Sequence, residues 1–227
     1  MQILKTAAAA AGLAVVLSAP ALAAPLTGLF AVQYYQGDNG TTGLKTDPAQ
    51  QALPSAIAAI GAAAVHFTSP SFTYNGPLAL TQLVNPPLIS GFFASAFGTT
   101  SIVLPGTTMS TGSFASETLI KFTFTTVGTI SGSITHDDGI SLFKAGDTAT
   151  NLLPGASAPT SAVATPFAGL VQGTYDLYYT EANGAAAQLT FDVTNGNATT
   201  RVPEPVSMAL LGSGLLGLGL ARRMRRG

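Results

Sequence analysis

Two adjacent aspartates, Asp137 and Asp138, are the residues of this chain whose type and spacing best suit chemistry. They stand in THDDGISLF, residues 135–143, directly before a short apolar segment. Neighbouring carboxylates repel each other, so the pair either lies in water or holds a positive ligand. Calcium prefers several oxygen ligands and would suit the pair, whereas Asp-Asp-Gly is also an ordinary turn sequence. The residues alone leave both interpretations open.

Sequence motifs of catalysis are missing from the chain, which predicts that the protein is not an enzyme. There is no G-x-S-x-G, no H-E-x-x-H and no P-loop. The two histidines, His66 and His136, stand in no supporting motif. Glycoside hydrolysis needs two carboxyl groups about 5–9.5 Å apart across the scissile bond, and adjacent aspartates in a turn do not indicate that arrangement.

The charges of the central part of the chain indicate the kind of partner it can bind. Residues 24–201 carry four Lys and Arg against nine Asp and Glu side chains, a net charge of −5, although the whole chain sums to −1. An acidic surface disfavours nucleic acid, which needs a basic one, and permits a divalent cation. The chain has no cysteine, so no disulfide can stabilise it.

Segments of alternating polarity before and after the aspartates predict the strands that position them. In ETLIKFTFTTV, residues 117–127, Ile120, Phe122 and Phe124 share one face, which is the pattern of a strand with one buried side. Short strands with regular turns between them predict an all-β sandwich or barrel. The other predicted strands are 29–35, 65–74, 129–135, 140–144, 175–180 and 187–193.

The remaining segments are less regular. An alanine-rich apolar pattern predicts one helix over 47–64, with a break at Pro54. Residues 75–115 are rich in Gly, Pro, Ser and Thr, and their strands and loops cannot be assigned. Residues 148–166 are predicted to be a loop, and 194–201 a linker.

The N-terminus has the pattern of a secretory signal peptide. A positive residue, Lys5, precedes an apolar run from Ala7 to Leu17, which is too short to span a bilayer. Ala21-Leu22-Ala23 is a small-x-small cleavage site, so residues 1–23 are predicted to be removed after Ala23 or Ala24. The alternative is an N-terminal anchor helix.

The C-terminus has the pattern of a membrane anchor. Sixteen apolar or small residues, Val206 to Ala221, cover about 24 Å as a helix, which is marginal for a hydrocarbon core of about 30 Å. The alternative is a buried core helix, which the following arginines disfavour. These are Arg222, Arg223, Arg225 and Arg226, and they would stay on the cytoplasmic side.

This C-terminal region, 202–227, resembles the PEP-CTERM sorting signal. The order is Pro203-Glu204-Pro205, then a glycine-rich apolar span, then the arginine cluster. The resemblance implies a protein exported by a Gram-negative bacterium and recognised by an exosortase. It also implies a transient anchor in the inner membrane, and then a place on the cell surface or in an exopolysaccharide biofilm matrix.

The central domain, residues 24–193, resembles the PA-14 domain. The resemblance rests on Gly28-Leu29 with Tyr34-Tyr35, and on Asp137-Asp138-Gly139 followed by an apolar strand. It continues with Gly173-x-Tyr175 and with the turn after Glu181. It implies a PA-14-like antiparallel β-sandwich with minor helix.

In the flocculin-type lectins of this family, two aspartates joined by a cis peptide bond hold a calcium ion that binds sugar hydroxyls. The resemblance therefore implies carbohydrate binding by Asp137, Asp138 and Asn183. Calcium would be held mainly by Asp137 and Asp138, with Glu181 or Asn183 completing its ligands. The expected partner is an extracellular polysaccharide or another glycan. The alternative is a non-lectin structural component of the surface or matrix, with the aspartates as a plain turn.

Overall fold

The computed structural model describes residues 23–38, 40, 43–184, 186–197 and 199–201. Residues 1–22 of the predicted signal peptide and the whole predicted sorting signal, 202–227, lie outside these ranges. Within the described residues, no helix is both long and apolar enough to cross a membrane.

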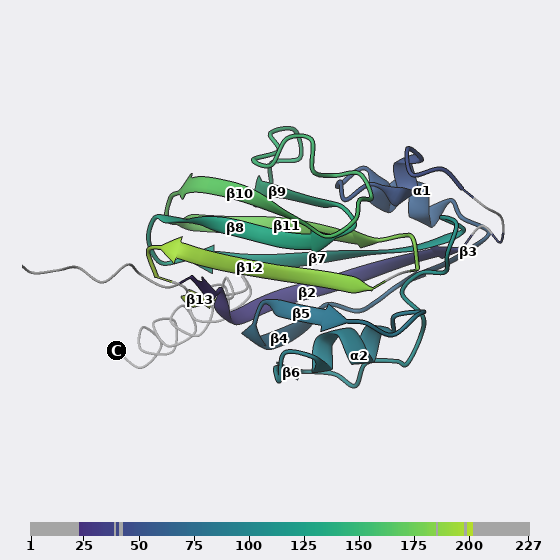
Figure 1. Cartoon of the computed structure of the whole chain (residues 1–227), viewed down its shortest axis with the longest axis horizontal. Coiled ribbons are helices and arrows are strands. Elements are labelled where there is room, and N and C mark those ends of the chain that lie inside the picture. The colour runs from purple at the N-terminus through teal and green to yellow at the C-terminus, as the bar shows by residue number, and fades with distance from the viewer. Residues whose placement is uncertain (1–22, 39, 41–42, 185, 198, 202–227) are drawn as a thin grey trace, which may run out of the picture.

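Two sheets pack face to face, and they confirm the predicted antiparallel β-sandwich (Figure 1). The larger sheet has the order β6-β4-β2-β13-β7-β11-β9, with β3 beside β2. Its pairings are antiparallel except that of β13 with β2. Its strands are β2 (Thr27–Asp38), β3 (Val65–Thr68), β4 (Phe72–Pro77), β6 (Thr99–Thr100), β7 (Ser116–Thr126), β9 (Ile140–Lys144), β11 (Gly173–Glu181) and β13 (Thr199–Arg201).

The smaller sheet has the order β1-β12-β8-β10, with β5 also paired to β12. All of its pairings are antiparallel. Its strands are β1 (Ala24–Pro25), β5 (Ala79–Gln82), β8 (Ile130–Asp137), β10 (Val163–Leu170) and β12 (Ala187–Asn195).

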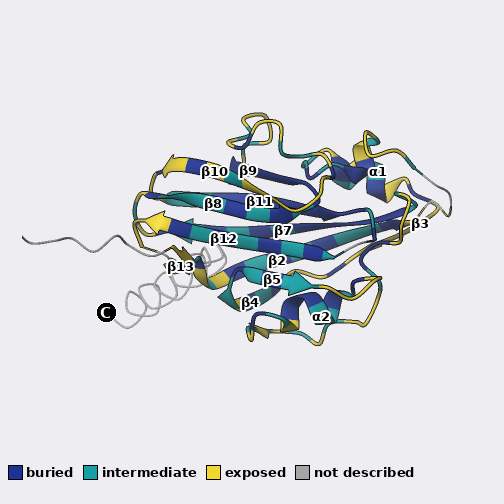
Figure 2. Cartoon of the chain, in the orientation of Figure 1, coloured by how far each residue is buried: buried dark blue, intermediate teal, exposed yellow. Residues whose placement is uncertain are grey.

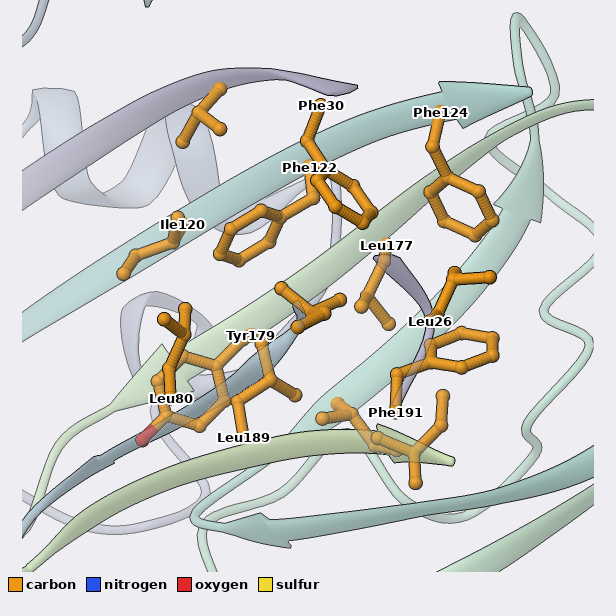
Figure 3. Packing of buried hydrophobic residues seen from close by; sticks show 14 of the residues in the cluster. Leu26, Phe30, Leu80, Ile120, Phe122, Phe124, Leu177, Tyr179, Leu189 and Phe191 are labelled. Atoms are coloured by element: carbon orange, nitrogen blue, oxygen red, sulfur yellow. The ribbon is translucent and has the colours of Figure 1, made fainter. Parts of the chain in front are cut away.

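The core between the sheets is rich in aromatic residues (Figure 3). The expected inner face of β7 is confirmed, because Ile120, Phe122 and Phe124 are fully buried. The ring of Phe124 meets that of Phe191 from β12 edge-on at 5.7 Å. Each such side chain contributes roughly 1.5–3 kcal/mol by leaving water. Figure 2 shows buried residues along the central strands and exposed ones mainly in the loops.

The predicted helix over 47–64 is wrong in extent. The structure has a short 3-10 helix, η1 (Pro48–Gln50), and a short α-helix, α1 (Ala56–Gly61). Pro54 lies between them, where it prevents a continuous helix. Apolar residues of this segment cover the outer face of the larger sheet and contact Leu119 of β7. Both faces of β7 are therefore buried at this end.

Three other expectations need correction. The predicted strand 65–74 is two strands, β3 and β4, separated at Pro70. The predicted loop 148–166 includes the first half of β10. The predicted linker 194–201 includes β13, which lies between β2 and β7. The unassigned region 75–115 contains β5, β6 and a short helix, α2 (Ile89–Ala94).

The antiparallel strands give the sandwich two distinct ends. At one end Thr200 of β13 pairs with Thr126 of β7, and the described chain finishes there at Arg201. At the other end Glu181 pairs with Thr118, close to the end of β8 at Asp137. Eight residues along β7 separate these two levels, which is about 27 Å. We call them the exit end and the aspartate end.

Candidate functional site

The Asp-Asp-Gly sequence forms the turn between β8 and β9 at the aspartate end. Asp138 has a positive φ of 34°, near the left-handed region that short polar residues tolerate better than most. A Cβ on Gly139 would lie 2.1 Å from the backbone oxygen of Ser157, so only glycine fits there. Among the described residues the cis peptide bond is Asn85–Pro86. The cis bond that the resemblance implies between Asp137 and Asp138 is therefore not found.

Asp138 is fully buried, and its carboxylate is used to hold the turn after β11. Its Oδ2 accepts hydrogen bonds from the backbone N–H groups of Ala182 at 2.7 Å and Asn183 at 3.1 Å. Its Oδ1 accepts one from the side-chain amide of Asn183 at 2.9 Å. Burial raises the pKa of Asp138 to about 6, although these amide bonds oppose the rise.

Glu181 is also fully buried, beside Asp138 rather than open to solvent. Its Oε1 accepts a hydrogen bond from Ser110 at 2.9 Å, and its Oε2 lies 3.0 Å from the hydroxyl of Tyr179. Burial and the negative charge of Asp138 raise its pKa to about 8, so Glu181 carries a proton at neutral pH. That proton completes the network, because the single Tyr179 hydroxyl hydrogen already points to the backbone oxygen of Asp137 at 2.6 Å.

Asp137 is the part of the pair that stays half-exposed. Its Oδ1 makes only a long contact, 3.3 Å, with the backbone N–H of Asp138. Burial raises the pKa of Asp137 above its ordinary value. Of the four predicted ligands, Asp137 is therefore the carboxylate that an external ligand can reach without breaking short hydrogen bonds.

An isolated histidine at the end of a strand is usually exposed, but His136 is buried. Its Nδ1 contacts the backbone oxygen of Asp138, and its Nε2 lies 2.8 Å from the hydroxyl of Thr165. Because a carbonyl only accepts, Nδ1 carries the hydrogen and Nε2 accepts from the threonine. Burial lowers the pKa of His136, so the ring is neutral and structural.

The predicted calcium ligands lie in one corner, yet their arrangement does not make a cation shell. The amide donors already occupy the Asp138 carboxylate, and Glu181 is sealed inside in its protonated form. Within the described residues, no three or more His, Asp or Glu side chains are grouped to hold a metal ion. As arranged, the corner fits a hydrogen-bonded anchor, and calcium stays a prediction.

A groove of about 310 Å³ opens at the same end of the sandwich, and sequence reasoning missed it. One wall carries Phe67, 48% exposed, and Val65, both from β3. Asp38 at the end of β2 adds a carboxylate. Hydroxyl groups come from the segment before β7, with Thr107, Thr108 and Thr111.

We call the cluster of Asp137, Asp138, Glu181 and Asn183 the aspartate corner. The groove lies next to it. The segment 107–111 lines the groove, and its Ser110 also bonds to Glu181 and accepts from the backbone N–H of Gly184 at 2.9 Å. Tyrosine rings often stack on sugars, but four tyrosines of this chain do not reach solvent. Tyr74, Tyr175, Tyr178 and Tyr179 are all buried in the core or beneath α1. Phe67 and its neighbour His66, both exposed, are therefore the ring side chains of the groove available to a ligand.

Two solved structures with a similar fold are PA14 domains. The fold is similar to the PA14 sugar-binding domain from an RTX adhesin, with a TM-score of 0.47 and 18% identity over 74% of this chain and 96% of that one. It is also similar to the PA14 domain of the antifreeze protein MpAFP, with a TM-score of 0.42 and 15% identity over 77% and 87% of the two chains. No protein-family model and no curated protein matches the sequence.

Proposed function

We propose that this chain is an exported surface or matrix protein that binds carbohydrate at the aspartate end. The observation that carries the proposal is the groove, where the half-exposed ring of Phe67 stands beside the Asp38 carboxylate and several threonine hydroxyls. A sugar ring has an apolar face that packs on an aromatic side chain, and hydroxyls that need polar partners. The half-exposed Asp137 extends the polar surface next to it.

The orientation of the domain supports this proposal. Its described chain leaves at the exit end, about 27 Å from the aspartate end. The predicted PEP-CTERM signal, with the predicted membrane span at Val206 to Ala221, would begin directly after that exit. An exosortase would act there, and the groove would face away from the membrane. The sequence motifs of an enzyme are absent, so we propose binding without catalysis.

The alternative is a structural component of the surface or matrix that binds no glycan. One observation favours it. The carboxylate of Asp138 accepts hydrogen bonds from the turn that contains Asn183, and Glu181 is fully buried next to it. These residues then shape the end of the sandwich and bind nothing external. The two functions differ in a direct binding measurement.

Glycan binding by the full chain, compared between two single variants, tests the proposal. Phe67→Ala removes the aromatic surface, and we expect it to weaken binding roughly tenfold or more, because one aromatic contact of this kind is worth about 1–2 kcal/mol. Asp137→Asn removes the exposed charge, and we expect a smaller loss. The measurement is a glycan array followed by titration calorimetry. Absence of binding to any glycan on the array would support the structural alternative.

Calcium titration separates two versions of the proposal. Saturable heat that disappears in Asp137→Asn, with glycan binding lost in chelator, would support cation-assisted recognition. Equal glycan binding in calcium and in chelator would support direct recognition by the groove. The hydrogen bonds that hold Asp138 lead us to expect the second result.

A further inference from the structure

Two of the most exposed large apolar side chains flank β6, one on each side of it in the sequence, at the edge of the larger sheet. Phe97, just after α2, is 97% exposed, and Val103 is 96% exposed. Gly98, which follows Phe97, lines the same hollow of about 440 Å³ as Val103. We call Phe97, Gly98 and Val103 the apolar tip. The part of the molecule that carries it, with α2 and β6, projects from the lower side in Figure 1.

Neither packing nor backbone geometry explains a phenylalanine at position 97. Its φ is 55°, in the left-handed region. Its N–H bonds to the backbone oxygen of Ala94 in the last turn of α2, a position where glycine is the favoured residue. An aromatic residue there is strained, and almost all of its surface faces water. A contact outside the folded domain would account for the residue.

The segment of the chain that carries the apolar tip has no charged residue. From Phe67 to Ser116 the sequence contains no Asp, Glu, Lys, Arg or His. In contrast, residues 24–201 as a whole have thirteen charged side chains. A partner recognised through charge complementarity is therefore disfavoured. A surface that accepts exposed apolar groups without charges fits the boundary of a lipid bilayer.

Gly98, which follows Phe97 in the apolar tip, lies at the level of the exit end, where the described chain finishes. A Cβ on Gly76 would meet the Cα of Gly98 at 2.7 Å. Gly76 pairs with Gly28 of β2, and Gly28 pairs with Thr200 of β13. Three neighbouring strand spacings therefore separate Gly98 from Thr200, which is about 14 Å.

The chain beyond Arg201 supplies the argument for a membrane as the occupant. Only residues 202–205 separate the end of β13 from the predicted membrane span at Val206 to Ala221. Four residues reach at most about 14 Å when extended. Before any processing, the exit end must therefore lie close to the bilayer that this predicted span would enter.

We propose that the apolar tip inserts into the interfacial region of that bilayer. Phe97 would enter the boundary between headgroups and acyl chains, where aromatic side chains are favoured. With the predicted span as the first attachment, the tip gives a second one. Two attachments fix the orientation of the domain, so the groove and the aspartate corner point away from the lipid.

Because the chain contains no tryptophan, one substitution at the tip creates a specific probe. We would reconstitute full-length Phe97→Trp into vesicles of phosphatidylethanolamine and phosphatidylglycerol, with or without bromine on the acyl chains. We expect a blue-shifted emission relative to detergent and strong quenching by the brominated lipid. The matched control is Phe67→Trp at the aspartate end, which we expect to stay unquenched by bromine and open to acrylamide.

Three outcomes would overturn the proposal. If brominated lipid does not quench the emission of Phe97→Trp, the tip does not reach the bilayer. Equal quenching of both tryptophans would show that the domain has no fixed orientation. An emission shift in detergent that depends on protein concentration would show that a second copy of the chain covers the tip. Phe97→Gly should melt at the same or a higher temperature than the unmodified chain, which separates these outcomes from misfolding.

Discussion

Asp138→Ala will destabilise the domain by about 3–5 kcal/mol, while Asp137→Ala will cost less than about 1 kcal/mol. The substitution at position 138 removes a fully buried carboxylate and leaves two backbone N–H groups and the Asn183 side-chain amide without their acceptor. Each orphaned buried donor costs about 1–3 kcal/mol. Asp137 is half-exposed and makes one long contact.

Urea unfolding of the full chain and the two variants measures this difference. Asp138→Asn is the closest control, because it keeps the size of the side chain and replaces one acceptor oxygen by a donor. We expect it to lie between the other two in stability, nearer to Asp138→Ala. Similar costs at both positions would contradict the anchor role of Asp138 and favour a solvated turn.

The free energy of unfolding will fall as the pH rises from about 5 to about 8, and Glu181→Gln will remove a large part of that fall. The pKa of Glu181 is raised to about 8, mainly by burial. In the unfolded chain this carboxyl loses its proton near its ordinary pKa. The folded state therefore holds an extra proton between these two values, and stability that is fully present below the ordinary pKa is lost as the pH rises.

Glutamine is a good mimic of the protonated glutamate. Its oxygen can accept from Ser110, and its amide can donate to the hydroxyl of Tyr179, so the network of Glu181 survives without a titrating group. Each unit of pKa shift corresponds to about 1.4 kcal/mol, so the expected gain at about pH 8 is a few kcal/mol. Urea unfolding of both chains across this pH range measures it.

Glu117 provides an independent comparison in another part of the molecule. It lies under η1, where its Oε2 accepts from the Gln50 amide at 2.6 Å and its Oε1 has no hydrogen-bond partner among the described residues. Burial raises its pKa to about 7, although the bond to Gln50 opposes the rise. Glu117→Gln should remove a further part of the pH dependence, and Asp138, whose pKa is also raised, accounts for part of what remains. Unfolding stability that is constant or rises with pH in the unmodified chain would contradict both assignments.

Local patterns in the sequence predict the strands that are buried on at least one side. The alternation of Ile120, Phe122 and Phe124 predicts the core face of β7, and the apolar run 140–144 predicts β9 with its observed bounds. These patterns work because each of these strands has neighbours that bury a fixed face. The residues 75–115 have no comparable alternation, since their strands are short and lie at sheet edges or beside a helix.

There are physical reasons why β10 and β13 are not predicted from the sequence. β10 is a mostly exposed edge strand and contains Pro166, so it lacks both alternation and strand-like composition. β13 is three residues long and polar, and its place between β2 and β7 depends on pairing with distant segments. No local pattern can show such pairing.

The candidate site is predicted only in part for the same reason. The sequence identifies Asp137 and Asp138 as unusual, and the turn with Glu181 and Asn183 does lie beside them. Which of two adjacent carboxylates is buried depends on the turn after β11, which is more than forty residues away. The groove depends on β3 and the segment 107–111 meeting at one end of the sandwich, and neither has a motif that would reveal it.

The separation of the two ends also determines how the domain would respond to mechanical force. A load between the aspartate end and the chain beyond Arg201 runs along β2, β7 and β11, which connect one end to the other. Because β13 runs parallel to β2, toward the aspartate end, such a pull first opens the bonds of Arg201 and Thr200 one after another, and only then loads the long strands in shear. β13 is held on both sides, by β2 and by β7, so the first strand to feel a pull from the C-terminal side is enclosed within the sheet. If the predicted anchor and the proposed ligand are both engaged, the long strands of the larger sheet would carry the tension between them.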